Sequence, residues 1–86
     1  KEDGEVLMRQ IVAVMDKGVA ALEVQALIDV HYNNLRQFYD PNITMYRGLG
    51  QMYVDDPRFT AYFENFAAGL AVFMRDAICV YCDIHE

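Results

Sequence analysis

The sequence predicts an all-α fold, a compact bundle of about five helices that forms one domain over residues 1–86. Apolar residues recur every three or four positions along most of the chain, which is the period of an amphipathic helix. No stretch shows the strict alternation of a half-buried strand. The composition, 55% apolar and 23% charged, is typical of a packed globular domain, and 86 residues suffice for one modest core.

The first two helices are predicted from their apolar faces. Asp3 is positioned to start the first helix and Gly18 to end it. The second helix is expected from about Ala20 to Phe38. The inward faces are Leu7, Met8, Ile11, Val12 and Met15 in the first helix, and Ala20, Val24, Leu27, Ile28, His31, Leu35 and Phe38 in the second.

The third helix follows a break at Pro41, which disfavours helical geometry at the residue before it, and Asn42 is a good N-cap. Gly48 and Gly50 lie inside this helix, where each costs up to about 1 kcal/mol relative to alanine. Close packing of a neighbouring helix is the favoured explanation, and room for a flat ligand is the alternative. Its expected inward residues are Met45, Tyr46, Leu49, Met52 and Tyr53.

The fourth helix has the sharpest start signal, with Asp56 as N-cap and Pro57 at the first helical position, where its missing N–H costs nothing. Gly69 marks a bend before the last helix. The fourth helix should place Phe59, Tyr62, Phe63 and Phe66 on one side, and the last should bury Leu70, Phe73, Met74, Ala77, Ile78 and Tyr81. The predicted core comprises Leu27, Leu35, Leu49, Phe59, Leu70, Phe73 and Ile78.

Charge and residue inventory argue against several function classes. The net charge is −6 and the seven basic residues are scattered, so another part of the polypeptide must contact any DNA. The two histidines, His31 and His85, form no catalytic constellation, and an enzyme is not expected. Cys79 and Cys82 should stay reduced, without a metal. The longest apolar runs are too short to span a membrane.

The chain from Ala20 to Tyr81 resembles the TipAS drug-recognition domain of MerR-type transcription activators that respond to thiopeptides and other bulky antibiotics. Each matching segment alone is weak evidence for the family, but finding all of them in the expected order is specific evidence. The segments that carry the resemblance are Val30–Leu35 with its histidine, Phe38–Asp40, Met45–Val54, Asp56–Phe59, and Gly69–Ala71 with Asp76–Ile78.

The resemblance implies a truncated, globin-like bundle that traps lipophilic, often heteroaromatic antibiotics in a cleft between helices, with no cofactor. It implies that the chain is a fragment of a longer cytoplasmic regulator, a homodimer, whereas the isolated domain is expected to be a monomer. Promoter DNA and RNA polymerase would be contacted only through the missing parts, including an N-terminal DNA-binding domain. Some family members capture thiopeptides through a cysteine near the start of the third helix. Because residues 41–50 contain no cysteine, reversible binding is expected.

A ligand site is expected around the second, third and fourth helices. Six Tyr, five Phe and five Met supply rigid and polarizable surface for planar ligands, although these residues can equally form the core. Tyr39, Tyr46 and Tyr53 are the strongest candidates, because a phenol lining a cleft can offer its hydroxyl to a ligand. The predicted ligand-binding residues are His31, Tyr32, Leu35, Tyr39, Tyr46, Leu49, Tyr53, Phe59 and Phe63.

Two alternative functions remain open at this point. His31 on an apolar face suggests a haem or other tetrapyrrole binder, although the chain is much shorter than a globin. A plain protein-interaction bundle would dock a partner helix in an apolar groove. For His31 itself, a structural hydrogen-bonded role is favoured over ligand contact.

Overall fold

A computed structural model describes residues 2–86 of the chain, and these form helices and turns without a strand. The predicted all-α bundle is confirmed. The helices are α1 (Glu2–Ala13), α2 (Leu22–Leu35), α3 (Ile43–Asp55), α4 (Pro57–Glu64) and α5 (Leu70–His85), with a short 3-10 turn η1 (Met15–Lys17) after α1. Within residues 2–86, no helix is both long and apolar enough to cross a membrane.

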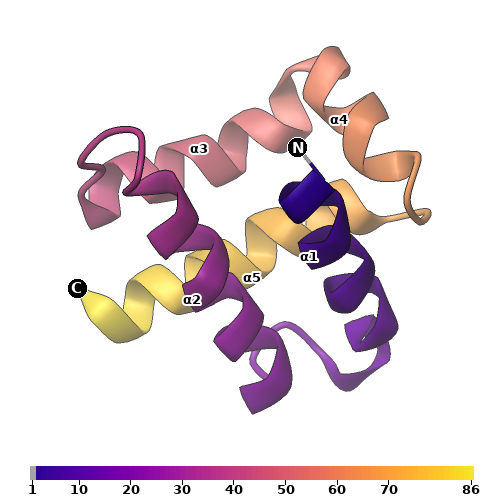
Figure 1. The fold of residues 1–86 in the computed structure, drawn as a ribbon, viewed down its shortest axis with the longest axis horizontal. Helices are drawn as coiled ribbons and strands as arrows, with labels where there is room; N and C mark the ends of the chain where they lie inside the picture. Colours follow the sequence, from indigo (N-terminus) through magenta and orange to yellow (C-terminus); the bar gives the residue numbers. More distant parts are fainter. Residues whose placement is uncertain (1) are drawn as a thin grey trace.

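Helix α5 is the centre of the bundle. It packs against α2, α3 and α4, most extensively against α3, and Figure 1 shows α3 and α5 running in opposite directions. α1 and α2 form a second antiparallel pair, which crosses α5 in Figure 1. The buried residues of α5 are Leu70, Ala71, Met74, Ala77, Ile78, Tyr81 and Cys82, nearly half of the buried hydrophobic core.

The predicted helix starts at Asn42 and Asp56 are confirmed. The Asn42 side chain accepts a hydrogen bond from the backbone N–H of Met45 at 2.8 Å, and Asp56 accepts one from the N–H of Arg58 at 3.0 Å. Pro57 occupies the first turn of α4. These side chains satisfy N–H groups that the helix itself leaves without partners.

Both glycine boundaries have left-handed φ angles, which residues with a side chain rarely adopt. Gly18 has φ 99° and ends the 3-10 turn rather than α1, which already ends at Ala13. Gly69 has φ 85° at the start of α5, where the Glu64 carboxylate accepts hydrogen bonds from the N–H groups of Gly69 and Ala71. Asp3 lies within α1 instead of preceding it, and its side chain is outside the described residues.

Several residues predicted to point inward are exposed. α2 ends at Leu35, and Phe38 in the following turn is 83% exposed. In α3 only the stripe of Tyr46, Gly50 and Tyr53 is buried, because this narrow face meets α5. Met45 and Met52 lie beyond its edges and are exposed.

The predicted core is only partly correct. Leu70 and Ile78 are fully buried, whereas Leu27, Leu35, Leu49 and Phe73 pack against the core from its margin. The prediction that Phe59 lies in the core is wrong, since it is 36% exposed. Its neighbour Phe63 occupies the buried position, because the short α4 presents only one narrow face to the bundle.

The two α3 glycines differ in their surroundings. A Cβ built on Gly50 would lie 3.2 Å from Cγ2 and 3.3 Å from Cβ of Ile78, so the packing explanation holds for Gly50. Gly48 is exposed, with no atom within 4 Å of its hypothetical Cβ. Close packing therefore does not explain Gly48.

We expect the same substitution, glycine to alanine, to change stability differently at Gly48 and at Gly50. Gly48→Ala should raise the free energy of unfolding by about 0.5–1 kcal/mol, because alanine loses less backbone entropy in a helix. Gly50→Ala brings the same entropic gain but forces Ile78 to move, so it should be less stable than Gly48→Ala by about 1–3 kcal/mol. Urea unfolding of the two variants measures the difference. Equal stabilities would show that α3 and α5 can separate at Gly50 without strain.

Candidate functional site

A cavity of about 580 Å³ lies among α1, α2, α3 and α4. Its volume falls in the range of small-molecule sites, and its lining is mainly apolar and aromatic. The lining residues are Gly4, Leu7 and Met8 from α1, His31, Asn34 and Leu35 from α2, Tyr53 from α3, and Arg58, Phe59, Tyr62 and Phe63 from α4.

The α2 wall is built around His31, which is one helical turn beyond the fully buried Ile28. His31 Nδ1 and the Tyr46 hydroxyl oxygen are 2.7 Å apart, which is a short hydrogen bond. Burial lowers the pKa of His31 to about 4, because the enclosed ring loses the hydration that its charged form needs. His31 is therefore a neutral imidazole near pH 7.

The α3 and α4 walls are aromatic. The Tyr53 ring packs against Phe63 with a centroid separation of 4.5 Å and against Phe59 at 5.7 Å, while Tyr62 contacts Phe63 edge-on at 5.1 Å. The Thr60 hydroxyl donates to the Tyr53 carbonyl at 2.7 Å and so fixes the short turn between the helices. These rings present flat apolar surface to the cavity, suited to aromatic ligands.

Tyr53 also brings a polar atom to this wall. Tyr53 is only 5% exposed. Among the described side chains, none forms a hydrogen bond with its hydroxyl. Burial raises the pKa of Tyr53, and the nearby Tyr39 and Tyr62 hydroxyls raise it further, so the phenol stays protonated.

Arg58 is the one charged residue among the described lining residues. Its guanidinium forms two hydrogen bonds to the Asp56 carboxylate, at 3.2 and 2.9 Å, which keep the side chain beside the start of α4. The same contact holds the pKa of Asp56 below its usual value. The Arg58 side chain is 87% exposed, so it belongs to the mouth of the cavity.

Five of the nine residues predicted to bind ligand line this cavity: His31, Leu35, Tyr53, Phe59 and Phe63. The structure places the other four elsewhere. Tyr32 donates its hydroxyl to the Pro41 carbonyl at 2.7 Å, and Tyr46 is fully buried behind His31. Tyr39 lies exposed in the turn before α3, and Leu49 packs against the core.

Sequence reasoning missed the contribution of α1 to the cavity. Leu7 and Met8 were expected to face inward, and they do, but nothing in their spacing indicates that they border an open space. Asn34, Arg58 and Tyr62 were missed as well. Arg58 follows the predicted cap Asp56-Pro57, which places it in the first turn of α4. This position was the one sequence signal for a residue at the opening of the cavity.

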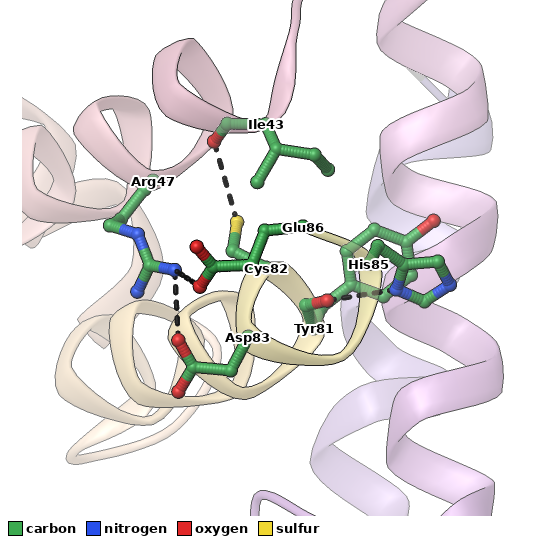
Figure 2. A network of polar contacts seen from close by, with 7 residues as sticks. All are labelled: Ile43, Arg47, Tyr81, Cys82, Asp83, His85 and Glu86. Carbon is green, nitrogen blue, oxygen red and sulfur yellow. Dashed lines mark hydrogen bonds and ion pairs between the residues drawn. The ribbon is translucent and has the colours of Figure 1, made fainter.

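The two cysteines lie away from the cavity lining. Cys82 is buried and donates its thiol to the Ile43 carbonyl at 3.5 Å, as Figure 2 shows, and burial raises the pKa of this thiol. In the same view Arg47 joins α3 to the end of α5 through Asp83 at 2.8 Å and Glu86 at 3.1 Å. Cys79 is partly buried. Residues 2–86 contain no group of three or more His, Cys, Asp or Glu side chains placed to hold a metal ion.

Comparison with known sequences gives a match over nearly the whole chain. The family described as the TipAS antibiotic-recognition domain matches residues 1–81. The HTH-type transcriptional activator mta of Bacillus subtilis (strain 168) is 38% identical over 81 residues, covering 93% of this chain and 32% of mta. TipA of Streptomyces coelicolor, also an HTH-type transcriptional activator, is 38% identical over 91% of this chain and 32% of its own length. The chain thus spans about a third of the length of these relatives.

Two solved structures share the fold. One is TipAS of a thiopeptide antibiotic multidrug resistance system from Streptomyces lividans, solved in complex with nosiheptide. It superposes with a TM-score of 0.90 at 33% identity, covering 99% of this chain and 62% of that one. The antibiotic binding domain of a TipA-class multidrug resistance transcriptional regulator gives a TM-score of 0.88 at 34% identity, covering 100% of this chain and 95% of that one.

Proposed function

This chain belongs to the TipAS antibiotic-recognition domain family, and we propose that it binds lipophilic aromatic or heterocyclic antibiotics reversibly in the cavity between α1, α2, α3 and α4. The family resemblance inferred from residues 20–81 is confirmed, and it extends through the first helix, since the family match starts at residue 1.

The observation that carries this proposal is the cavity itself. Its volume of about 580 Å³ suits a drug-sized ligand, and its walls combine aromatic faces with few polar groups. Such a lining favours flat apolar ligands through area burial and ring contacts, while His31, Asn34 and Tyr53 can fix their orientation.

We further propose that the domain is the sensor of a longer MerR-type transcription activator. Support comes from the relatives, which are HTH-type transcriptional activators about three times as long as this chain. The net charge of −6 also favours a division of labour, in which a separate N-terminal part contacts promoter DNA. In this proposal the parent protein is a homodimer that acts on RNA polymerase, the isolated domain is a monomer, and no catalytic step is involved.

Titration of the chain with several chemically unrelated lipophilic aromatics, followed by amide NMR shifts, tests the proposed cavity. We expect micromolar or tighter binding, on the order of −8 kcal/mol. Phe59→Ala removes a lining ring and should weaken binding roughly ten-fold, which corresponds to about 1.4 kcal/mol. Phe38→Ala is the matched control, because Phe38 is exposed outside the cavity and its loss should leave affinity unchanged. No binding across the panel, or equal loss in both variants, contradicts the proposal.

Reversibility has its own measurement. Neither Cys79 nor Cys82 lines the cavity, so neither thiol is placed to attack a ligand there, and burial also raises the pKa of the Cys82 thiol. Incubation with a thiopeptide that contains dehydroalanine should therefore leave the intact mass of the protein unchanged. An adduct on either cysteine would refute reversible capture while leaving the cavity assignment standing.

A further inference from the structure

His31 is held by a buried phenol, and the direction of that hydrogen bond can be worked out. Tyr46 is fully buried, with its ring packed against Tyr32 at 4.8 Å and Tyr81 at 5.8 Å between centroids. Its hydroxyl has one proton and two possible acceptors, His31 Nδ1 at 2.7 Å and the Ile28 carbonyl at 3.4 Å. At 3.4 Å the Ile28 carbonyl lies beyond the usual range of an O–H···O hydrogen bond, which ends at about 3.0 Å. The comparison of the two distances therefore places the Tyr46 proton on the contact with His31, where Tyr46 donates to Nδ1.

This assignment determines which ring nitrogen of His31 carries a proton. A neutral imidazole has one N–H, and a nitrogen that accepts from Tyr46 cannot be the protonated one. His31 is neutral near pH 7 because burial lowers its pKa to about 4. The proton is then on Nε2, which forms no hydrogen bond with any described residue, while the ring lines the cavity. His31 consequently offers the cavity a donor and no acceptor.

We propose that His31 selects ligands by donating a hydrogen bond from Nε2–H to an uncharged acceptor, such as a ring nitrogen or a carbonyl, and that Tyr46 positions His31 for this role. The inference rests on the proposed function and adds the polarity that the ligand must present. A ligand that presents only a donor would require His31 to exchange its tautomer, and Tyr46 would then have to donate to the Ile28 carbonyl at 3.4 Å, outside the usual hydrogen-bond range. A ligand without an acceptor leaves Nε2–H without a partner once water is displaced.

Two probes of nearly identical shape test the selection. Phenanthridine carries a ring nitrogen acceptor, and phenanthrene is its hydrocarbon analogue. The ratio of their dissociation constants, measured by equilibrium dialysis at pH 7.5, should favour phenanthridine in the wild-type chain by roughly three- to ten-fold more than in His31→Phe. Comparison with the variant cancels the different hydration of the two probes.

Two further variants sharpen the result. Tyr46→Phe keeps the buried ring but removes the hydroxyl, so the ratio should fall toward that of His31→Phe. Phe59→Ala should weaken both probes alike and leave the ratio unchanged, because it removes only ring contact. A ratio that does not differ between the wild type and His31→Phe overturns the inference and leaves the proposed function intact. If neither probe nor any member of the antibiotic panel binds, the proposed function fails.

The tautomer can be tested without any ligand. Nitrogen NMR of the His31 side chain should show a protonated Nε2 and an unprotonated Nδ1 in the wild-type chain, and a mixture of tautomers in Tyr46→Phe. A protonated Nδ1 in the wild type would mean that His31 donates to Tyr46, and it would overturn the inference whatever the probes do.

Discussion

Replacing Leu70 by alanine is expected to lower the free energy of unfolding by about 2–5 kcal/mol, the range measured for buried leucine truncations. Leu70 is the first residue of α5 and is fully buried, in a core that also contains Met74 and Ile78. The shorter side chain loses transfer free energy and leaves a cavity that closely packed helices cannot close. Urea or guanidinium unfolding followed by circular dichroism measures the change.

Leu22→Ala is the matched control for this truncation. Leu22 is also the first residue of its helix, α2, but its side chain is 86% exposed. The same chemical change there should alter stability by less than about 0.5 kcal/mol. If Leu70→Ala and Leu22→Ala had similar effects, the inward face of α5 would be assigned incorrectly.

Acid should destabilise the chain through His31. Its pKa is lowered to about 4 in the folded state by burial, against an ordinary value of 6.5. The unfolded chain therefore binds a proton at this ring below pH 6.5, whereas the folded chain binds one only near pH 4. The contribution of His31 to the free energy of unfolding is fully present above pH 6.5, and it is lost progressively as the pH falls to about 4. The loss should reach roughly 2–3 kcal/mol, somewhat below the full linkage value because the ring borders a solvent-accessible cavity.

His31→Gln isolates this effect. Glutamine does not titrate, and its amide oxygen can still accept a hydrogen bond from Tyr46. All carboxylates remain in both proteins, so the difference in unfolding free energy between wild type and variant, measured from pH 4 to pH 7.5, reports the titration of His31 alone. The wild type should lose more stability than the variant on acidification. Parallel curves would mean that the ring is hydrated in the folded state.

The helix boundaries were the part of the fold most open to prediction from sequence. Asn42 and Asp56 act locally, by accepting hydrogen bonds from backbone N–H groups two or three residues later, so their role depends little on the rest of the chain. The ends of α1 and α2 were less predictable. There the apolar pattern continues through Met15 and Phe38, beyond the last residue of each helix, and no strong stop signal stands at the true end.

The candidate site was predictable in its chemistry but not in its walls. His31, Tyr53 and Phe63 could be inferred because aromatic and histidine side chains on a helical face suit a ligand site. Whether a given ring lines a cavity or fills the core depends on how the helices cross, and local sequence does not specify that. Tyr46 and Tyr53 illustrate the point, since they lie two turns apart on the same stripe of α3, and only Tyr53 borders the open space.

The placement of so much of the core in α5 bears on how the domain is made in the cell. A ribosome synthesises the chain from its N-terminus, so α1 to α4 emerge before the helix against which most of them pack. Until α5 has left the ribosome, the Tyr46 ring lacks its contact with Tyr81, and the faces of α2, α3 and α4 that pack against α5 expose apolar surface. Cooperative folding of this domain must therefore follow the synthesis of α5, and we expect a chain arrested before Leu70 to expose the apolar surface that chaperones and proteases recognise.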